Sequence, residues 1–233
     1  SAHDNCETLL DGAVYAHCMN GIMNINRKGY SITRNVVISK SRRIGFGSAH
    51  WEAETRHVLK NAVLVDNPIQ LDGRYIDAEN VLIAQVDPEL QPERLIGALG
   101  PFSCNKLTAV GNGMHFFLHR KRERVTIRNS VFAGSDCLWS FNVSHPFDSV
   151  ALQNVALSRT AELQWGPGSR EHDATLAAWL EKQPPDIAGD CDLIDPEPLL
   201  QAVAGSAAVP EADGRGADAE LWQTFQTGLP SSN

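Results

Sequence analysis

The chain lacks any long hydrophobic run. No stretch approaches the roughly 18–20 apolar residues that a membrane-spanning helix requires. A positively charged leader with an apolar core is also missing, and Ser1 suggests a processed end. We therefore expect no membrane partner, and we expect a secreted or periplasmic protein whose signal peptide has been removed.

Basic residues are scarce, above all toward the C-terminus. The net charge is −8, and residues 183–233 hold nine acidic residues against a single basic one, Arg215. A negative surface repels phosphates, so the composition argues against a nucleic-acid partner. The rest of the chain is close to neutral and carries almost all of the Lys and Arg.

Cysteine is scarce as well, with five residues and no Cys-x-x-Cys motif. Cys6 could pair with Cys18, and Cys104 with Cys137, because each pair falls within one coil or nearby coils of the repeat described below. Small buried thiols are the alternative, which we favour. The redox state thus stays open at this point.

What the sequence does contain is a repeat of about two dozen residues. Four apolar segments each carry a central Asn (Asn35, Asn61, Asn129 and Asn154), and they span 32–38, 58–64, 125–132 and 150–157. Less faithful copies lie at 81–86 and 106–110, and a leading copy lies at 8–14. A shorter apolar segment follows each copy, for example at 43–47 and 68–72. Such a period is typical of a solenoid, whose coils bury their apolar faces only by stacking.

The segments are short, rich in Val, Ile, Leu and Phe, and bounded by Gly, Asn, Asp and Pro, which indicates strands. We predict an all-β fold, a right-handed parallel β-helix of about six to seven coils over residues 1–172. The central Asn tolerates left-handed backbone angles at a bend, and its amide can bond the same amide one coil away. We expect a buried Asn ladder that Ala84 and Ala109 interrupt.

The two ends of the predicted helix differ. The repeats begin almost at once, so we expect a second chain or a missing N-terminal segment to cover the first coil. Residues 173–233 are expected to form a capping helix at 174–182, with Asp173 as its N-cap, and then an irregular acidic tail rich in Ala, Gly and Pro. Residues 218–226 have the spacing of one further short helix.

On these repeats, the chain resembles the pectate-lyase-like superfamily of right-handed parallel β-helix proteins, over about residues 6–165. The superfamily includes polysaccharide lyases, uronan epimerases and glycoside hydrolases. The resemblance implies action on an acidic polysaccharide. Neither the motif of calcium-dependent pectate lyases nor the Asp-Pro-His-Asp signature of alginate epimerases is present.

Polar side chains after each strand are expected to form rows along the solenoid. The run from Ser39 to Arg43 is the sharpest feature: Arg42 and Arg43 could hold a uronate carboxylate, and Lys40 could remove the acidified C5 proton. The predicted catalytic residues are Lys40, His17, His50 and Arg43. The predicted substrate-binding residues are Arg42, Trp51, Glu52, Asp66, Arg74 and Arg120. The alternative interpretation of the segment from Ser39 to Arg43 is a basic turn exposed to solvent, without a catalytic function.

Three functions remain open from the sequence. A lyase or epimerase acting by proton abstraction comes first, and a non-catalytic β-helix that binds carbohydrate or belongs to a larger assembly is the alternative. A glycoside hydrolase using Asp66 and Asp87 is the third, since adjacent coils place two carboxylates close together. No metal or other cofactor is expected, and the acidic residues between 190 and 197 are only a weak candidate for calcium.

Overall fold

The computed structural model describes most of the repeat region and part of the C-terminal segment. The described residues are 2–3, 7–25, 29–48, 55–87, 89–90, 93–98, 100–111, 113–116, 124–134, 138–141, 150–165, 175–204, 215–221 and 223.

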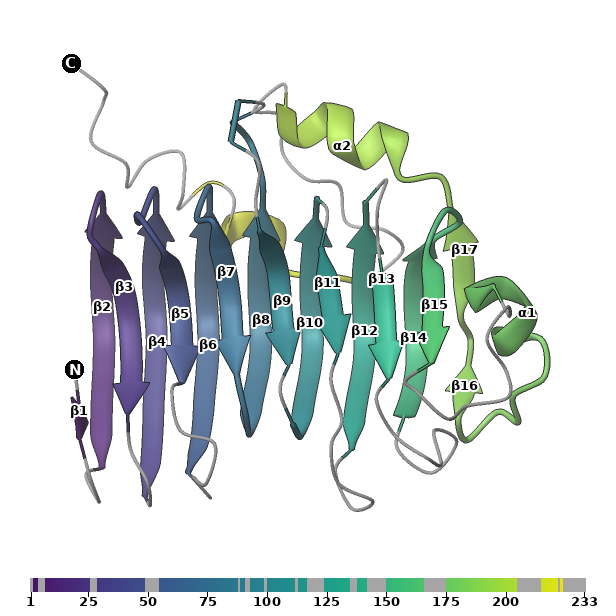
Figure 1. Cartoon of the computed structure of the whole chain (residues 1–233), viewed down its shortest axis with the longest axis horizontal. Helices are drawn as coiled ribbons and strands as arrows, with labels where there is room; N and C mark the ends of the chain where they lie inside the picture. The colour runs from purple at the N-terminus through teal and green to yellow at the C-terminus, as the bar shows by residue number, and fades with distance from the viewer. Residues whose placement is uncertain are drawn as a thin grey trace.

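Two layers of parallel strands wind into a solenoid (Figure 1). Long strands form one sheet: β2 (Thr8–Ala16), β4 (Tyr30–Ser39), β6 (Arg56–Val65), β8 (Ile76–Ala84), β10 (Phe102–Val110), β12 (Val125–Ala133) and β14 (Val150–Ser158). A short strand follows each of them: β3 (Asn20–Ile25), β5 (Ile44–Ser48), β7 (Ile69–Gly73), β9 (Arg94–Ala98), β11 (Met114–Phe116), β13 (Leu138–Phe141) and β15 (Glu162–Trp165). The predicted all-β parallel β-helix is confirmed.

The number of unbroken turns is smaller than predicted. The short strands form a continuous sheet from β3 to β11, and β1 (Ala2–His3) pairs with the outer side of β3. β13 and β15 form a separate two-stranded sheet. Both layers are therefore continuous over about four turns, β3 to β5, β7, β9 and β11, rather than over six to seven coils.

Every long strand bends at one residue with a left-handed backbone. These residues are Gly12, Asn35, Asn61, Asn80, Lys106, Asn129 and Asn154, with φ between 46° and 73°. The strand register places them opposite one another along the sheet. Gly and Asn prevail because they tolerate this conformation at the lowest cost.

The predicted Asn ladder is present, with two corrections. The expected interruptions at Ala84 and Ala109 are wrong, because these two residues are buried apolar positions, and Asn80 and Asn105 supply the rungs in β8 and β10. The ladder also lies on the outer face of the sheet, where Asn35 is exposed, rather than in the interior. Its amides bond from coil to coil, as in the 3.0 Å bond from Asn80 Nδ2 to Asn61 Oδ1. The outer position follows from the bend, which carries the polar side chain away from the core.

The bend divides the outer face of the long sheet into two halves. Before the bend the outward side chains are mostly polar, as in the row Arg34, Lys60 and Glu79. After the bend they are apolar and buried, as are Val63 and Leu82 at 1% and 2% exposure. Because these outward residues are buried, another part of the chain must cover the half of the outer face that follows the bend.

The C-terminal segment supplies much of that cover. Helix α2 (Glu197–Ala204) contributes Leu199, and residues 215–221 contribute Leu221, to a second apolar core on this face. The tail was expected to be irregular apart from 218–226, so α2 corrects that prediction. Residues 219–221 and 223 are helical, in agreement with the expected short helix. The main core between the two sheets remains separate from this outer one.

The solenoid is capped at its C-terminal end. β16 (Ala188–Gly189) and β17 (Asp192–Ile194) pair with β14, and helix α1 (Leu176–Leu180) buries Trp179 in the main core. The expected capping helix is thus present, but its N-cap is Thr175, whose side chain accepts a bond from the Ala178 amide. The predicted cap Asp173 lies outside the described residues.

Cys18, Cys104 and Cys191 are free thiols, which agrees with the favoured alternative. Cys104 is buried in the main core, and this burial raises the pKa of its thiol to about 12. The proposed partners Cys6 and Cys137 lie outside the described residues.

Candidate functional site

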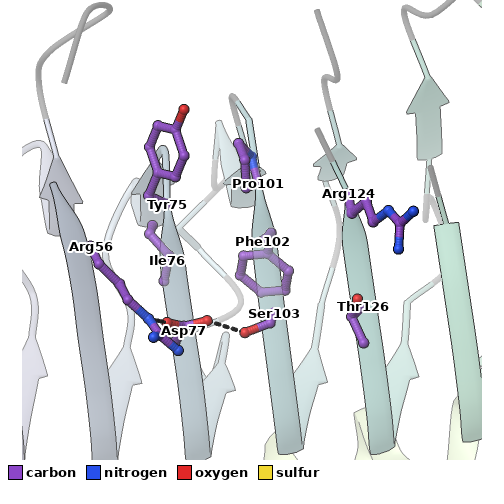
Figure 2. A pocket seen from close by; sticks show the side chains of 9 residues that line it. All are labelled: Arg56, Tyr75, Ile76, Asp77, Pro101, Phe102, Ser103, Arg124 and Thr126. Carbon is purple, nitrogen blue, oxygen red and sulfur yellow. Dashed lines mark hydrogen bonds and ion pairs between the residues drawn. The ribbon is translucent and has the colours of Figure 1, made fainter. Parts of the chain in front are cut away.

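A groove of about 420 Å³ crosses the outer face of the long sheet, where β6, β8, β10 and β12 begin (Figure 2). It is lined by Arg56, Tyr75, Ile76, Asp77, Pro101, Phe102, Ser103, Arg124 and Thr126. The strand register explains the assembly, because residues 56, 75, 101 and 124 occupy equivalent positions just before or at the start of four adjacent strands. The groove therefore runs along the solenoid axis over three steps, or about 14 Å.

A carboxylate in the floor holds one side of the groove in place. Asp77 accepts hydrogen bonds from Arg56 Nε and from Ser103 Oγ, as the dashed lines in Figure 2 mark. This contact raises the pKa of the Arg56 guanidinium, so that side chain stays positively charged. Arg56 is nonetheless 65% exposed, and its remaining donors face solvent.

The opposite side carries cations without a carboxylate partner among the described residues. Arg124, which directly precedes β12, lines the groove, and Arg128 on β12 lies just beyond it, two residues after Thr126 and beside Asn105 and Gln153 of the neighbouring strands. Both arginines are exposed. An exposed guanidinium with no internal partner is free to bind an external anion.

Other charges on this face pair with one another across strands. Arg34 and Asp11 are directly opposite, with 2.7 Å between Nη2 and Oδ2, and Lys60 and Glu79 are 2.8 Å apart. Hydrogen bonds from Arg34, which has the larger effect, and from Asn35 hold the pKa of the Asp11 carboxyl below its usual range. Among the described residues, these exposed pairs leave the β12 side of the groove as the side whose positive charge has no carboxylate partner.

Tyr75 supplies an aromatic surface at the same edge. Arg74, the residue before it, is 8% exposed, and its guanidinium lies 5.6 Å from the centre of the Tyr75 ring. Arg74 was predicted to bind substrate directly. Because its side chain is buried, it is better placed to support Tyr75 than to contact a ligand.

The predicted cationic cluster lies at the opposite end of the long strands. His17, Lys40 and Asp66 directly follow the equivalent strand ends of β2, β4 and β6, and all three have a left-handed backbone. The amide of His17 bonds the carbonyl of Ser39, and the amide of Lys40 bonds that of Val65. The structure thus brings these three into one row, as the sequence predicts, with His17 and Lys40 exposed.

Arg42 and Arg43 are exposed in the same turn, between β4 and β5. Neither forms an ion pair with any described carboxylate. The full strand length separates this cluster from the groove, so the two cationic sites are distinct.

Asp66 has a structural function in its row. Its Oδ1 accepts bonds from the amides of Val86 and Asp87, at 2.7 and 3.0 Å, and the residue is 6% exposed. The carboxylate therefore fixes the turn of the next coil, and this leaves little of it for substrate. Four other predicted residues, His50, Trp51, Glu52 and Arg120, lie outside the described residues.

Sequence reasoning missed most of the groove. Arg56, Tyr75, Asp77 and Arg124 are distant in sequence and meet only through the register of the coils. The one available signal was the equivalent position of these residues in successive repeats.

A second carboxyl with a perturbed pKa lies on the short sheet. Burial raises the pKa of Asp72, and Arg94, 3.7 Å away, partly offsets the increase. Asp72 lies on the short sheet and does not line the groove, so we assign it to neither cationic site.

Within the described ranges, no three His, Cys, Asp or Glu side chains gather in a way that could hold a metal ion. None of the helices in the described part of the chain is both long and apolar enough to cross a bilayer. Comparison of the chain with protein-family models, with curated proteins and with solved structures found no match. The fold and the groove therefore define a parallel β-solenoid with a cationic, aromatic surface groove.

Proposed function

We propose that this protein binds an acidic polysaccharide along the groove on its long sheet. The observation that carries the proposal is the position of Arg124 and Arg128, which are exposed, without a carboxylate partner among the described residues, and beside the groove that contains Tyr75. Guanidinium groups suit carboxylate ligands, and an aromatic ring suits the apolar face of a sugar.

The spacing of the coils supports a polymer rather than a single sugar. Successive strands are about 4.8 Å apart, which is comparable to the length of one sugar unit in an extended chain. A polymer along the solenoid axis would meet Arg56, Tyr75 and Arg124 in turn. Hydroxyl groups of Ser103 and Thr126 line the same path and can bond sugar hydroxyls.

Binding can be tested with a panel of polyuronates and a neutral polymer by isothermal titration calorimetry. The double variant Arg124→Gln, Arg128→Gln is expected to weaken polyuronate binding about tenfold, because two charge-assisted contacts are lost at an exposed site. The matched control is Arg42→Gln, Arg43→Gln, which removes two exposed cations from the other cluster and should leave affinity unchanged. Equal loss in both double variants would show that binding depends only on total charge, and would refute the groove.

A second candidate function, polysaccharide lyase or epimerase, is favoured by the row of His17 and Lys40. Arg42 or Arg43 would neutralise the uronate carboxylate, and Lys40 or His17 would take the C5 proton. In a lyase, the electron pair of that bond forms the C4–C5 double bond as the C4–O bond breaks, and water protonates the leaving oxygen. The unsaturated product absorbs in the ultraviolet.

Rising ultraviolet absorbance that Lys40→Ala abolishes would support the lyase. Loss of a deuterium label from C5 with inversion of that centre, and without new absorbance, would support the epimerase. Intact binding with neither signal would leave the non-catalytic function alone. The glycoside hydrolase using Asp66 and Asp87 has the weakest support, because Asp66 already bonds two backbone amides. Membership of the pectate-lyase-like superfamily and secretion both stay predictions that fit this substrate class.

A further inference from the structure

The large hydrophobic residues that are exposed on the described part of the molecule lie in the first coil or at the start of the next. Four large hydrophobic residues stand out as exposed there: Leu9 at 64%, Met19 at 56%, Val14 at 51% and Tyr30 at 40%. Three of the four belong to β2 or to the turn that follows it, and Tyr30 begins the next long strand. An apolar surface gathered at one end of a solenoid is typical of an interface.

β2 is also the terminal strand of the nine-stranded sheet, bonded to β4 on one side only among the described strands. Its inward residues Leu10, Ala13 and Tyr15 pack against the main core but remain only partly buried. Natural edge strands usually carry Lys, Pro or inward charges that block pairing with another chain. β2 contains neither Lys nor Pro, and its one charged residue, Asp11, is bonded to Arg34 and Asn35 of β4.

The opposite end of the solenoid cannot accept this edge, because β16, β17 and α1 cover β14 there. Head-to-tail pairing of β2 with β14 of another copy is therefore blocked. An isologous contact, in which the same edge of two copies meets across a two-fold axis, is the arrangement that remains for self-association.

The pattern of β2 suits such a contact. Because the strand bends at Gly12, residues 10 and 15 both point inward, and residues 9, 11, 14 and 16 all point outward. Reversing the strand about the midpoint between residues 12 and 13 exchanges 10 with 15, 9 with 16 and 11 with 14. In an antiparallel pair centred between residues 12 and 13, inward Leu10 would face inward Tyr15 of the second copy. Outward Leu9 would face outward Ala16 in the same way. Inward side chains of one copy would thus lie beside inward side chains of the other, and outward side chains beside outward ones.

We propose that two copies of this chain associate through antiparallel pairing of their β2 strands, which covers the open end of each solenoid. The pairing supplies partners for the edge backbone groups and buries Leu10, Tyr15 and their neighbours. This surface is separate from the groove, so the proposal does not rest on polysaccharide binding.

The test is the mass of the full chain in solution, measured by size-exclusion chromatography with light scattering over a dilution series. We expect a dimer that Val14→Asp and Leu9→Lys each convert to a monomer. In the proposed register residue 14 faces Asp11 of the second copy, so Val14→Asp places two carboxylates directly opposite each other, and Leu9→Lys sets a charge against the apolar Ala16. Tyr30→Lys is the matched control: it also replaces an exposed hydrophobic residue but lies off the paired strand, and it should leave the dimer intact. Circular dichroism checks that each variant is folded, which the exposure of all three positions favours.

Hydrogen exchange of the β2 amides separates the rival explanations. In the dimer, the amides that point away from β4 should lose protection on dilution. A monomeric wild-type chain, with β2 protected or unprotected, would overturn the proposal, and protection in that monomer would identify a segment of the same chain as the cover. A dimer that survives both Val14→Asp and Leu9→Lys would place the interface elsewhere and would overturn it equally.

Discussion

Single polar residues fix the turns of this solenoid. Asn67 is fully buried, and its Nδ2 donates to the carbonyls of Ile38 and Val65 and to Gln70 Oε1, while its Oδ1 accepts from the Ser41 amide. Gln70 in turn donates to the carbonyl of Ala84. These two side chains satisfy backbone groups from three successive coils, which buried turns need. The sequence predicted a polar row here but not this internal network.

One buried residue makes stability depend on pH. His57 is 1% exposed and points inward beside Ser31 and Ile76, and its Nδ1 has no hydrogen-bond partner among the described residues. Burial lowers the pKa of this imidazole from 6.5 to about 4. Between about pH 6.5 and 4, the imidazole is therefore protonated in the unfolded chain but neutral in the folded chain. The free energy of unfolding falls as the pH drops through this range.

The pKa gap sets an upper limit of about 3 kcal/mol on this loss. We expect His57→Gln to flatten the decline in the free energy of unfolding between pH 6.5 and 5, measured by urea denaturation. The exposed His17→Gln should keep the wild-type slope. Identical slopes in the wild type and His57→Gln would show that the buried imidazole is not the source.

At the scale of elements, the bent long strand determines the architecture. A left-handed residue in the middle of each strand reverses the alternation, so one strand places apolar residues toward both the main core and the outer core. The four faithful Asn positions were predictable because each interrupts an alternating apolar run. Asn80 and Lys106 were not, because aligning the copies on their apolar runs shifted those two repeats by a few residues.

The C-terminal segment was the least predictable element. Its residues 215–218 run back along the ladder: Arg215 bonds Asn154, the Gly216 amide bonds the Asn129 carbonyl, and the Asp218 amide bonds Asn80. An ion pair of 2.9 Å joins Asp218 to Lys106. Nothing local in an acidic sequence rich in Ala and Gly indicates this docking, since the acceptors lie 61 to 138 residues away.

Because this segment closes the outer core, its apolar contact should matter more than its charges. Leu221 is 9% exposed against that core. We expect Leu221→Asp to destabilise the protein by about 2–4 kcal/mol, since it places a charge in an apolar contact and opens a cavity. Thermal unfolding and binding of a hydrophobic dye would measure the loss of stability and the exposure of Val63 and Leu82.

The exposed neighbour Ala219→Asp is the control and should have little effect. Equal melting temperatures for the two variants would show that residues 215–221 rest on the solenoid without stabilising it.

At the scale of the whole molecule, stacking of the coils builds sites from residues that are distant in sequence. The fold class followed from the repeat alone, because a period of this length has few structural solutions. The groove did not, because Arg56 and Asp77 meet only once the register of β6 and β8 is known. The row of His17, Lys40 and Asp66 was predictable, since each residue directly follows a recognisable strand.

The central claim is that an acidic polysaccharide lies in the groove on the long sheet, and hydroxyl-radical footprinting read by mass spectrometry tests it most directly. Tyr75 lines the groove, whereas Met19 is 56% exposed close to the His17 and Lys40 row, so each reports on one cationic site. We predict that a polyuronate slows the oxidation of Tyr75 and leaves that of Met19 unchanged. Protection of Met19 without protection of Tyr75, or of neither residue under conditions where binding is measured, would contradict the account.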